Sequence, residues 1–584
     1  MSSAFAMEWG NKIMKNAPFN TLELLIITVI ALWGLQWVGP LMVNGELQIL
    51  SAITHAVAVI GGLRLLAESL ALVARLLDWL SSHSATGKEG TAFWARLKDL
   101  KAELSRRKTG PFWGVLVGSK KPLFIDYVSN AMTVAPAGSG KGIATVIPNL
   151  FSIRDSAVVG DFKGELLCVM KEPLEARGEK VVSLNPGGLW KERIGEGDSY
   201  NPLDIIVDDL HRPGGLRDVA DDLREFAAQT YPDPAENPGN DRYFNEGSRR
   251  AIAICTVIEV VVEEHDATLA SVALLLENRA DFEHNMRWIL GIDGEGKPDP
   301  QGPMPIEQAP WAQKHDPEDV AEFAKLVRSW ASNWLALMGS KTFDSFISGA
   351  QQALAPFAFG RLALAMRRST FSMNELKEGA RPVKLFIVAD ASRMEAYKAY
   401  IGLIQWCAMT AIKRHPNKSK PVYFIMDEAT NYKIHGLESL LTWGRSYGLR
   451  LHLIFQDLSA FERVYGKAAQ ETLLSETEIK QVLPGQRSPK TLEMMSKMLG
   501  DQSVMAASLT RQQASLHENM SEAGRPLMTP DEIRRCPYGL LFVRQAPPAL
   551  IEPVSYAEVH PWRKQAGINP FHGKPFLKKV RIRL

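Results

Sequence analysis

The chain has 584 residues, of which 46% are hydrophobic and 23% charged. This composition is typical of folded protein and excludes an intrinsically disordered chain, while the length exceeds what one hydrophobic core supports, so we expect two or more domains. The net charge of +2 excludes an overall field that would draw the whole molecule onto nucleic acid or acidic lipid.

Two apolar segments near the amino terminus predict a membrane hairpin within residues 1–80. Residues 24–43 carry no charge, and a helix of that length spans the roughly 30 Å hydrocarbon core of a bilayer. A second, weaker span follows at about 49–68. Lysines precede the first span, arginines end the second and the connecting loop has no base, so both termini are predicted to be cytoplasmic. A buried core helix and a signal peptide are the alternatives.

A Gly-rich segment between a strand-like run and an apolar helix pattern predicts a phosphate-binding loop. Its residues are Ala135, Pro136, Ala137, Gly138, Ser139, Gly140, Lys141 and Gly142. The glycines allow backbone N–H groups to surround phosphate oxygens, and Lys141 adds a positive charge. The alternative is a Gly-rich turn that binds no nucleotide.

Two positions depart from the usual GxxxxGK[ST] pattern of such loops. Ala135 replaces the first glycine, and Gly142 replaces the hydroxyl residue that binds magnesium. Ser139, Thr145 or a water molecule could supply the missing ligand, and the sequence does not choose among them.

An inserted helical domain is predicted between two parts of a strand-containing domain. From residue 216 to about 359 the sequence has helical periodicity, and a strand pattern resumes near 383. We therefore assign residues 81–205 and 371–560 to a nucleotide-binding domain and residues 206–370 to an all-α domain.

Polar residues follow two predicted strands in the second part of the nucleotide-binding domain. An apolar strand at 422–426 ends in Asp427 and Glu428. In a parallel sheet, Asp427 would hold Mg²⁺ through its water shell, and Glu428 would orient or deprotonate the attacking water. A strand at 449–455 ends in Gln456, an amide suited to sensing the γ-phosphate. Taken alone, an apolar strand followed by Asp427 and Glu428 is also compatible with an ordinary strand end.

For each of two charged residues, the sequence is compatible with two roles. Arg445 follows a predicted helix, where it is either an arginine finger for a neighbouring subunit or a solvated cation. Asp161 ends a strand predicted at 156–160 and is either another acid at the nucleotide crevice or only the start of a helix.

The last segment, residues 561–584, is basic. Seven lysines and arginines and no acid follow Glu558. Contact with phosphates or secretion partners and a solvated tail without a specific partner are equally consistent with this composition.

Together these motifs resemble the type IV secretion coupling proteins of the TraG/TraD group. The similar stretches are residues 135–150, 158–165, 424–457, 471–504 and 524–535, in the family's order. The resemblance implies an α/β, RecA-like P-loop NTPase domain with an inserted all-α domain and an N-terminal two-helix transmembrane hairpin. It also implies a homo-hexamer around a channel in the bacterial inner membrane.

The resemblance further implies a motor that uses ATP and Mg²⁺. Its implied partners are a relaxase, single- or double-stranded DNA without strong sequence preference, protein cargo, inner-membrane secretion components and the lipid bilayer. Carried over by position, Lys141 is the phosphate lysine, Asp427 the metal acid and Glu428 the water acid. Arg445 then matches the arginine finger and Gln456 the phosphate-sensing amide.

Two other functions remain as alternatives. A DNA segregation pump of the FtsK type shares the membrane segment and the motor, but the helical insertion and residues 524–535 argue against it. A non-hydrolysing adaptor that docks cargo at the secretion channel is suggested by the missing hydroxyl at Gly142.

Overall fold

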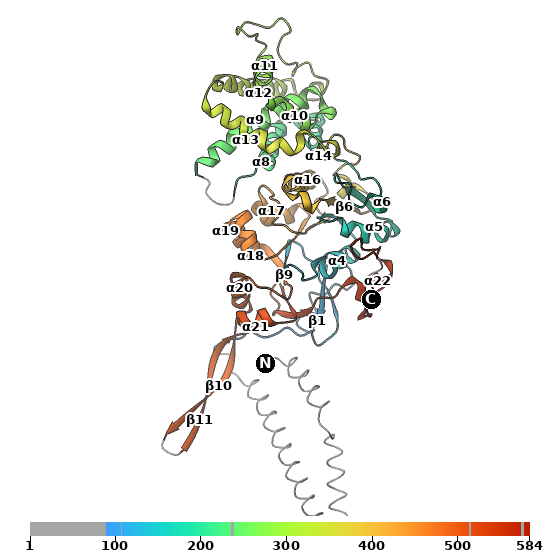
Figure 1. Cartoon of the computed structure of the whole chain (residues 1–584), viewed down its shortest axis with the longest axis vertical. Helices are drawn as coiled ribbons and strands as arrows, with labels where there is room; N and C mark the ends of the chain where they lie inside the picture. The colour runs from blue at the N-terminus through green and yellow to red at the C-terminus, as the bar shows by residue number, and fades with distance from the viewer. Residues whose placement is uncertain (1–88, 107, 235–238, 513–514, 574–576) are drawn as a thin grey trace, which may run out of the picture. The chain divides into compact units, whose positions relative to one another are not determined.

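The computed structural model describes residues 89–584 except 107, 235–238, 513–514 and 574–576 (Figure 1). The predicted spans at 24–43 and 49–68 lie outside the described residues. Among the residues that are described, no helix is long and apolar enough to cross a membrane. These residues form two compact units, one of residues 94–494 and 530–584 and the other of residues 89–93 and 495–529.

An 11-stranded sheet forms the core of the larger unit, in the order β2-β1-β13-β12-β9-β3-β8-β7-β4-β6-β5. Its strands are β1 (Phe112–Leu116), β2 (Pro122–Phe124), β3 (Asn130–Val134), β4 (Ser156–Asp161), β5 (Lys180–Leu184), β6 (Val383–Val388), β7 (Val422–Met426), β8 (Leu449–Phe455), β9 (Thr477–Val482), β12 (Gly539–Val543) and β13 (Ala549–Glu552). The strands from β9 to β5 are parallel, and the four others extend the sheet antiparallel. All parallel carboxyl ends therefore meet at one edge, where ligands bind in such sheets.

Helices and helical turns outside the insertion connect the strands of this sheet or follow them in the chain. They are η2 (Gly142–Val146), α4 (Ile147–Ser152), α5 (Glu165–Ala176), α6 (Lys191–Ile194), α15 (Glu375–Glu378), η5 (Ala391–Arg393), α16 (Met394–Arg414), α17 (Leu437–Trp443), η6 (Gly444–Tyr447), α18 (Leu458–Tyr465), α19 (Lys467–Glu476), α20 (Pro489–Leu499), α21 (Pro530–Arg535), η7 (Tyr556–Glu558) and α22 (Trp562–Gln565). Helix α16 is buried on nearly every side from Tyr400 to Ile412, because it packs both on β4 and on the inserted helices α8 and α13.

The insertion between β5 and β6 is helical. Its elements are α7 (Asp204–His211), α8 (Leu216–Thr230), α9 (Gly239–Val262), η3 (Glu264–Asp266), α10 (Leu269–Glu277), α11 (Arg279–Leu290), η4 (Pro310–Lys314), α12 (Pro317–Leu337), α13 (Lys341–Ala358) and α14 (Arg361–Ala365). Local sequence sets their starts: Asp316 caps α12 by accepting from the Glu318 N–H, with Pro317 at the first helical position. These helices and the sheet belong to the same compact unit.

The smaller unit contains a long β-hairpin that sequence analysis did not predict. Strands β10 (Asp501–Gln512) and β11 (Ser515–Pro526) pair antiparallel along their full length, from Asp501 opposite Pro526 to Gln512 opposite Ser515. The second part of the nucleotide-binding domain, assigned to 371–560, is therefore interrupted by a separate unit at 495–529.

The carboxyl-terminal segment belongs to the larger unit and buries a few of its side chains there, while most of its described basic side chains are exposed, so its contact with phosphates or partners stays a prediction. The Trp562 ring, 5% exposed, stacks on Phe151 with 5.5 Å between ring centroids. Strand β14 (Val559–His560) pairs with β15 (Ile582–Arg583), and Arg581 forms ion pairs with Glu552 and Glu558. Apolar burial, which a count of charges does not register, holds this segment in place.

Replacing Trp562 with alanine is expected to destabilise the protein by about 3 kcal/mol, because a fully packed indole is lost from the core. Thermal unfolding of the full chain in detergent would measure this as a lower Tm. Trp443 is a matched control, since it is 67% exposed and its replacement with alanine should change stability little. Equal decreases in Tm for Trp562→Ala and Trp443→Ala would contradict the packing of Trp562 in the core.

Candidate nucleotide-binding site

The predicted phosphate loop and the predicted metal and water acids meet at the carboxyl edge of the sheet. The loop follows β3 and the acids follow β7, on either side of β8. Although 287 residues separate Lys141 from Glu428, the two side chains form an ion pair. The Lys141 Nζ also lies 3.3 Å from Asp427 Oδ1. The expectation that these two segments share one site is confirmed, while the individual roles stay predictions.

The loop has the backbone that its glycines predict. Gly138 and Gly140 have φ angles of 79° and 77°, a left-handed conformation that glycine adopts without steric cost. The chain then enters η2, whose wide π-type turn is closed by a hydrogen bond from the Ile147 N–H to the Gly142 carbonyl. π-type turns of this kind are frequent at functional sites.

The acids follow β7 in a tight turn. Glu428 has a φ angle of 46°, an uncommon conformation for a residue with a side chain. Its N–H donates to Asp427 Oδ1 at 3.0 Å, and its carbonyl accepts from the Asn431 N–H at 2.8 Å. Strain of this kind, on the order of 1 kcal/mol, persists where the surrounding structure requires it. Here the turn directs both carboxylates at Lys141.

In the cluster of Lys141, Asp427 and Glu428, burial and neighbouring charges shift the pKa values in opposite directions. Burial raises the pKa of Asp427 to about 6, against the influence of Lys141. Burial by itself lowers the pKa of Lys141, but Asp427 and Glu428 more than offset it and hold that pKa above its ordinary value. At neutral pH Asp427 is therefore mostly ionised, and its carboxylate beside the Glu428 side chain offers the oxygen ligands that suit a divalent cation.

The donors and acceptors of the site fit a magnesium nucleotide. Two polar atoms at the site, Ser139 Oγ and Glu428 Oε2, are buried and have no hydrogen-bond partner among the described residues. Buried polar atoms of this kind usually have a partner, and phosphate oxygens, a metal-bound water or the attacking water would provide one. Lys141 and the loop N–H groups would hold the phosphates, and Asp427 would hold Mg²⁺.

The structure narrows the choice of magnesium ligand. Gly142 offers no hydroxyl, and Thr145 is fully buried with its Oγ1 directed at Gln481 Oε1, 3.4 Å away. Thr145 is therefore not available to a metal ion at the loop. Ser139 and water remain as alternatives.

Asp161 is the last residue of β4, and backbone groups that lead into α5 bind its carboxylate. Its carboxylate accepts hydrogen bonds from the Leu167 N–H at 2.9 Å and the Lys163 N–H at 3.3 Å, at the beginning of α5. Burial raises its pKa to about 7. Both carboxylate oxygens are bound by the backbone, and Asp427 lies close enough to raise the pKa of Asp161 further.

Gln456 and Arg445 lie at opposite ends of β8. Gln456 follows the carboxyl end and is level with the phosphate loop, since the Ala135 N–H donates to the Phe455 carbonyl at 2.8 Å. Arg445 lies in η6, before the amino end, and is exposed without an ion-pair partner in the described part of the chain. The 7 residues of β8, at about 3.3 Å each, separate the two edges by roughly 23 Å. Arg445 therefore cannot reach the Lys141 cluster of its own chain.

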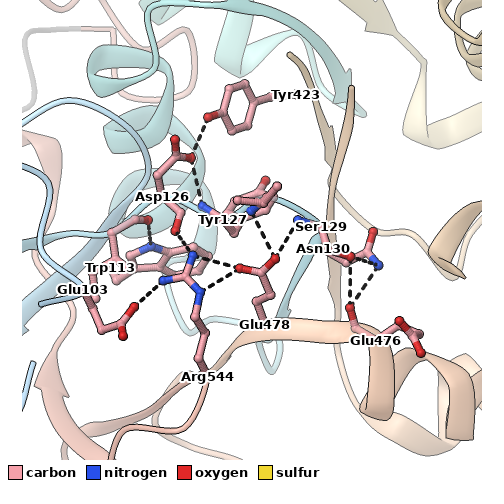
Figure 2. Close-up of polar contacts among 12 residues, drawn as sticks. Glu103, Trp113, Asp126, Tyr127, Ser129, Asn130, Tyr423, Glu476, Glu478 and Arg544 are labelled. Atoms are coloured by element: carbon pink, nitrogen blue, oxygen red, sulfur yellow. Dashed lines mark hydrogen bonds and ion pairs between the residues drawn. The ribbon is translucent and has the colours of Figure 1, made fainter. Parts of the chain in front are cut away.

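A polar network that sequence analysis missed stabilises the edge on which Arg445 lies (Figure 2). Arg544 pairs with Glu103 and Glu478 and donates to the Asp126 carbonyl at 2.8 Å. Asn130, the first residue of β3, donates through Nδ2 to the carbonyls of Leu441 and Glu476 at 2.7 and 3.1 Å. These contacts join the amino ends of β3 and β9 to α17. No local motif predicts them, because the partners come from five separate segments.

Comparison with known proteins identifies similar chains. The family model for type IV secretory system conjugative DNA transfer matches residues 87–558. Protein VirD4 of Agrobacterium fabrum (strain C58 / ATCC 33970) is 24% identical over 512 residues, covering 84% of this chain and 69% of the relative. The conjugal transfer protein TraG of Escherichia coli is 26% identical over 510 residues, covering 80% of this chain and 74% of the relative.

Solved structures of the plasmid coupling protein TrwB have the same fold. Its complex with the non-hydrolysable ATP analogue ADPNP aligns with a TM-score of 0.55 at 16% identity, covering 80% of this chain and 93% of TrwB. Its complex with ADP and Mg²⁺ aligns with a TM-score of 0.54 at 17% identity, covering 80% and 94%. The predicted α/β class with an inserted helical segment is confirmed.

Proposed function

Because this chain belongs to the type IV secretory system conjugative DNA transfer family, we propose that it is an ATP-driven coupling protein. In this function it moves relaxase-bound single-stranded DNA, together with any protein cargo, to the secretion channel. The observation that carries the proposal is the cluster of Lys141, Asp427 and Glu428 beside the phosphate loop. The nucleotides named in the TrwB complexes support ATP and Mg²⁺ as its ligands.

Each residue of the site would have a separate role in ATP hydrolysis. Lys141 exchanges its carboxylate partners for the outer phosphates, which leaves Asp427 free to hold Mg²⁺ and Glu428 free to take a proton from the attacking water. Bound Mg²⁺ withdraws charge from the phosphate oxygens. Gln456, level with the loop, would contact the γ-phosphate and transmit the loss of that phosphate along β8.

The rest of the assembly is proposed from the sequence and from the position of Arg445. The spans at 24–43 and 49–68 would anchor the chain in the bacterial inner membrane with both termini in the cytoplasm, next to the secretion components. A ring of six subunits would place Arg445 of one subunit at the nucleotide of the next. The exposure of Arg445, on the sheet edge opposite its own site, supports this arrangement.

A second function, a non-hydrolysing adaptor, is favoured by one observation. Gly142 lacks the magnesium-binding hydroxyl, and the nearby Thr145 hydroxyl is engaged with Gln481. An adaptor would bind nucleotide without hydrolysing it.

ATP hydrolysis by the detergent-extracted full chain tests the two functions. We expect a basal rate that single-stranded DNA of any sequence stimulates and that salt suppresses, since backbone phosphates provide the contacts. Glu428→Gln should retain ATP binding while hydrolysis falls by about 10²-fold or more, because the general base is lost. If the wild type binds ATP without hydrolysing it at any DNA concentration, the adaptor is correct.

A further inference from the structure

A row of buried polar side chains lies beneath the phosphate loop. It consists of His452 on β8, Thr133 on β3, Gln481 on β9 and Thr145 on η2, none of which is more than 1% exposed. The first three lie on adjacent strands of the sheet, and Thr133 is in register with Gln481. Apolar side chains could fill the same space without needing partners, so this polar row requires an explanation.

One oxygen atom in this row joins the two ends of the loop. Gln481 Oε1 accepts from Thr133 Oγ1 at 3.0 Å and from Thr145 Oγ1 at 3.4 Å. Thr133 lies two residues before Ala135, where the loop begins, and Thr145 lies four residues after Lys141, where the loop has ended. Gln481 thus links the strand that enters the loop to the helix that leaves it.

The remaining atoms of the row fix the direction of its hydrogen bonds. Thr133 gives its one hydroxyl proton to Gln481, so it accepts from His452 Nε2 at 2.7 Å. His452 must therefore carry a proton on Nε2. Burial lowers the pKa of His452 to about 3, so the ring is neutral. The Gln481 amide donates to the Trp113 carbonyl at 3.4 Å.

The wide turn of η2 brings Thr145 into this row. A π-type turn advances fewer degrees per residue than an α-helical turn, so Thr145 faces the sheet at a different angle from that of a regular helix. The same turn immediately follows Lys141. This one turn therefore determines both the direction of the Thr145 side chain and the position at which the helix starts after Lys141.

We propose that Gln481 is a positioning residue for the nucleotide site. Through its hydrogen bonds with Thr133 and Thr145, it keeps the two ends of the phosphate loop at a fixed separation. This inference rests on the proposed function, because it assigns the loop to nucleotide. Gln481 itself does not touch the nucleotide. Its role is to place the loop N–H groups and Lys141 where the phosphates bind.

The experiment compares nucleotide affinity with stability in the full-length protein. Thr145→Val and Gln481→Met should each weaken binding of a fluorescent non-hydrolysable ATP analogue about threefold to tenfold, as expected for one buried hydrogen bond. Thr145→Ser keeps the hydroxyl and should restore wild-type affinity. The double variant should lose little more than the weaker-binding single variant, because both remove the same contact.

Thr256→Val is the matched control. Thr256 is fully buried in α9 and donates to the Ile252 carbonyl at 2.8 Å, so its replacement removes one buried hydroxyl hydrogen bond in the inserted domain. It should lower the Tm about as much as Thr145→Val while leaving analogue affinity unchanged.

Two results would overturn the inference in distinguishable ways. If Thr145→Val and Gln481→Met bind the analogue as the wild type does and lose only Tm, the row is a structural feature and the proposed function stands. If the wild type and Lys141→Ala are equally unable to bind the analogue, the nucleotide function fails, and the positioning role fails with it.

Discussion

Replacing Lys141 with alanine is expected to reduce DNA-stimulated ATP hydrolysis at least 10²-fold, to background. The ammonium group is the charge placed for the outer phosphates, and loss of one such preorganised group typically costs 10² to 10³ in rate. Its loss also leaves Asp427 and Glu428 close together without their cation. Since Lys141 lowers the pKa of Asp427, that pKa will rise above about 6, and less carboxylate will be available to Mg²⁺ at neutral pH.

Steady-state hydrolysis with saturating single-stranded DNA measures this effect. Lys467→Ala is the control, since Lys467 is a surface residue of α19 whose side chain is 77% exposed, and it should hydrolyse ATP at the wild-type rate. Wild-type activity in Lys141→Ala would show that the cluster at the sheet edge is not the hydrolytic site.

Replacing Arg445 with alanine is expected to reduce hydrolysis about 10³-fold, the usual effect of losing an arginine finger. The physical reason is the separation along β8, which puts Arg445 and Lys141 at opposite edges of the same sheet. A residue so placed acts on a neighbouring subunit or on none. Its loss should leave nucleotide binding close to the wild-type value, because the loop that holds the phosphates is unchanged.

Mixing two kinds of inactive subunit shows whether Arg445 acts on a neighbouring subunit or has no role in hydrolysis. Arg445→Ala subunits retain Glu428, and Glu428→Gln subunits retain Arg445, so mixed rings contain some interfaces with both groups. At equal amounts and random assembly roughly one interface in four is intact, and activity should recover accordingly. Arg463→Ala, which removes an exposed arginine of α18, should be fully active by itself. No recovery at any mixing ratio would remove Arg445 from the mechanism.

The site shows how far local sequence carries a prediction. Lys141, Asp427 and Glu428 were predicted to share one site because each follows a recognisable strand, and parallel strands bring their carboxyl ends to one edge. Thr145 was a candidate metal ligand on spacing alone, and its hydroxyl is instead engaged with Gln481. The direction of a side chain depends on the pitch of the turn that carries it, and a π-type turn has no sequence signature that we could have used.

The amino-acid sequence by itself determined the α/β class, the inserted helices, the Gly-rich loop and the acids that face it, because periodicity and glycine placement are local properties of the backbone. Only the tertiary structure decided that Gln481 joins both ends of the loop, that Trp562 anchors the basic carboxyl-terminal segment, and that Arg445 faces away from its own site. These depend on contacts between residues far apart in the chain. Such contacts form through packing and pairing across strands, which no local pattern of residues records.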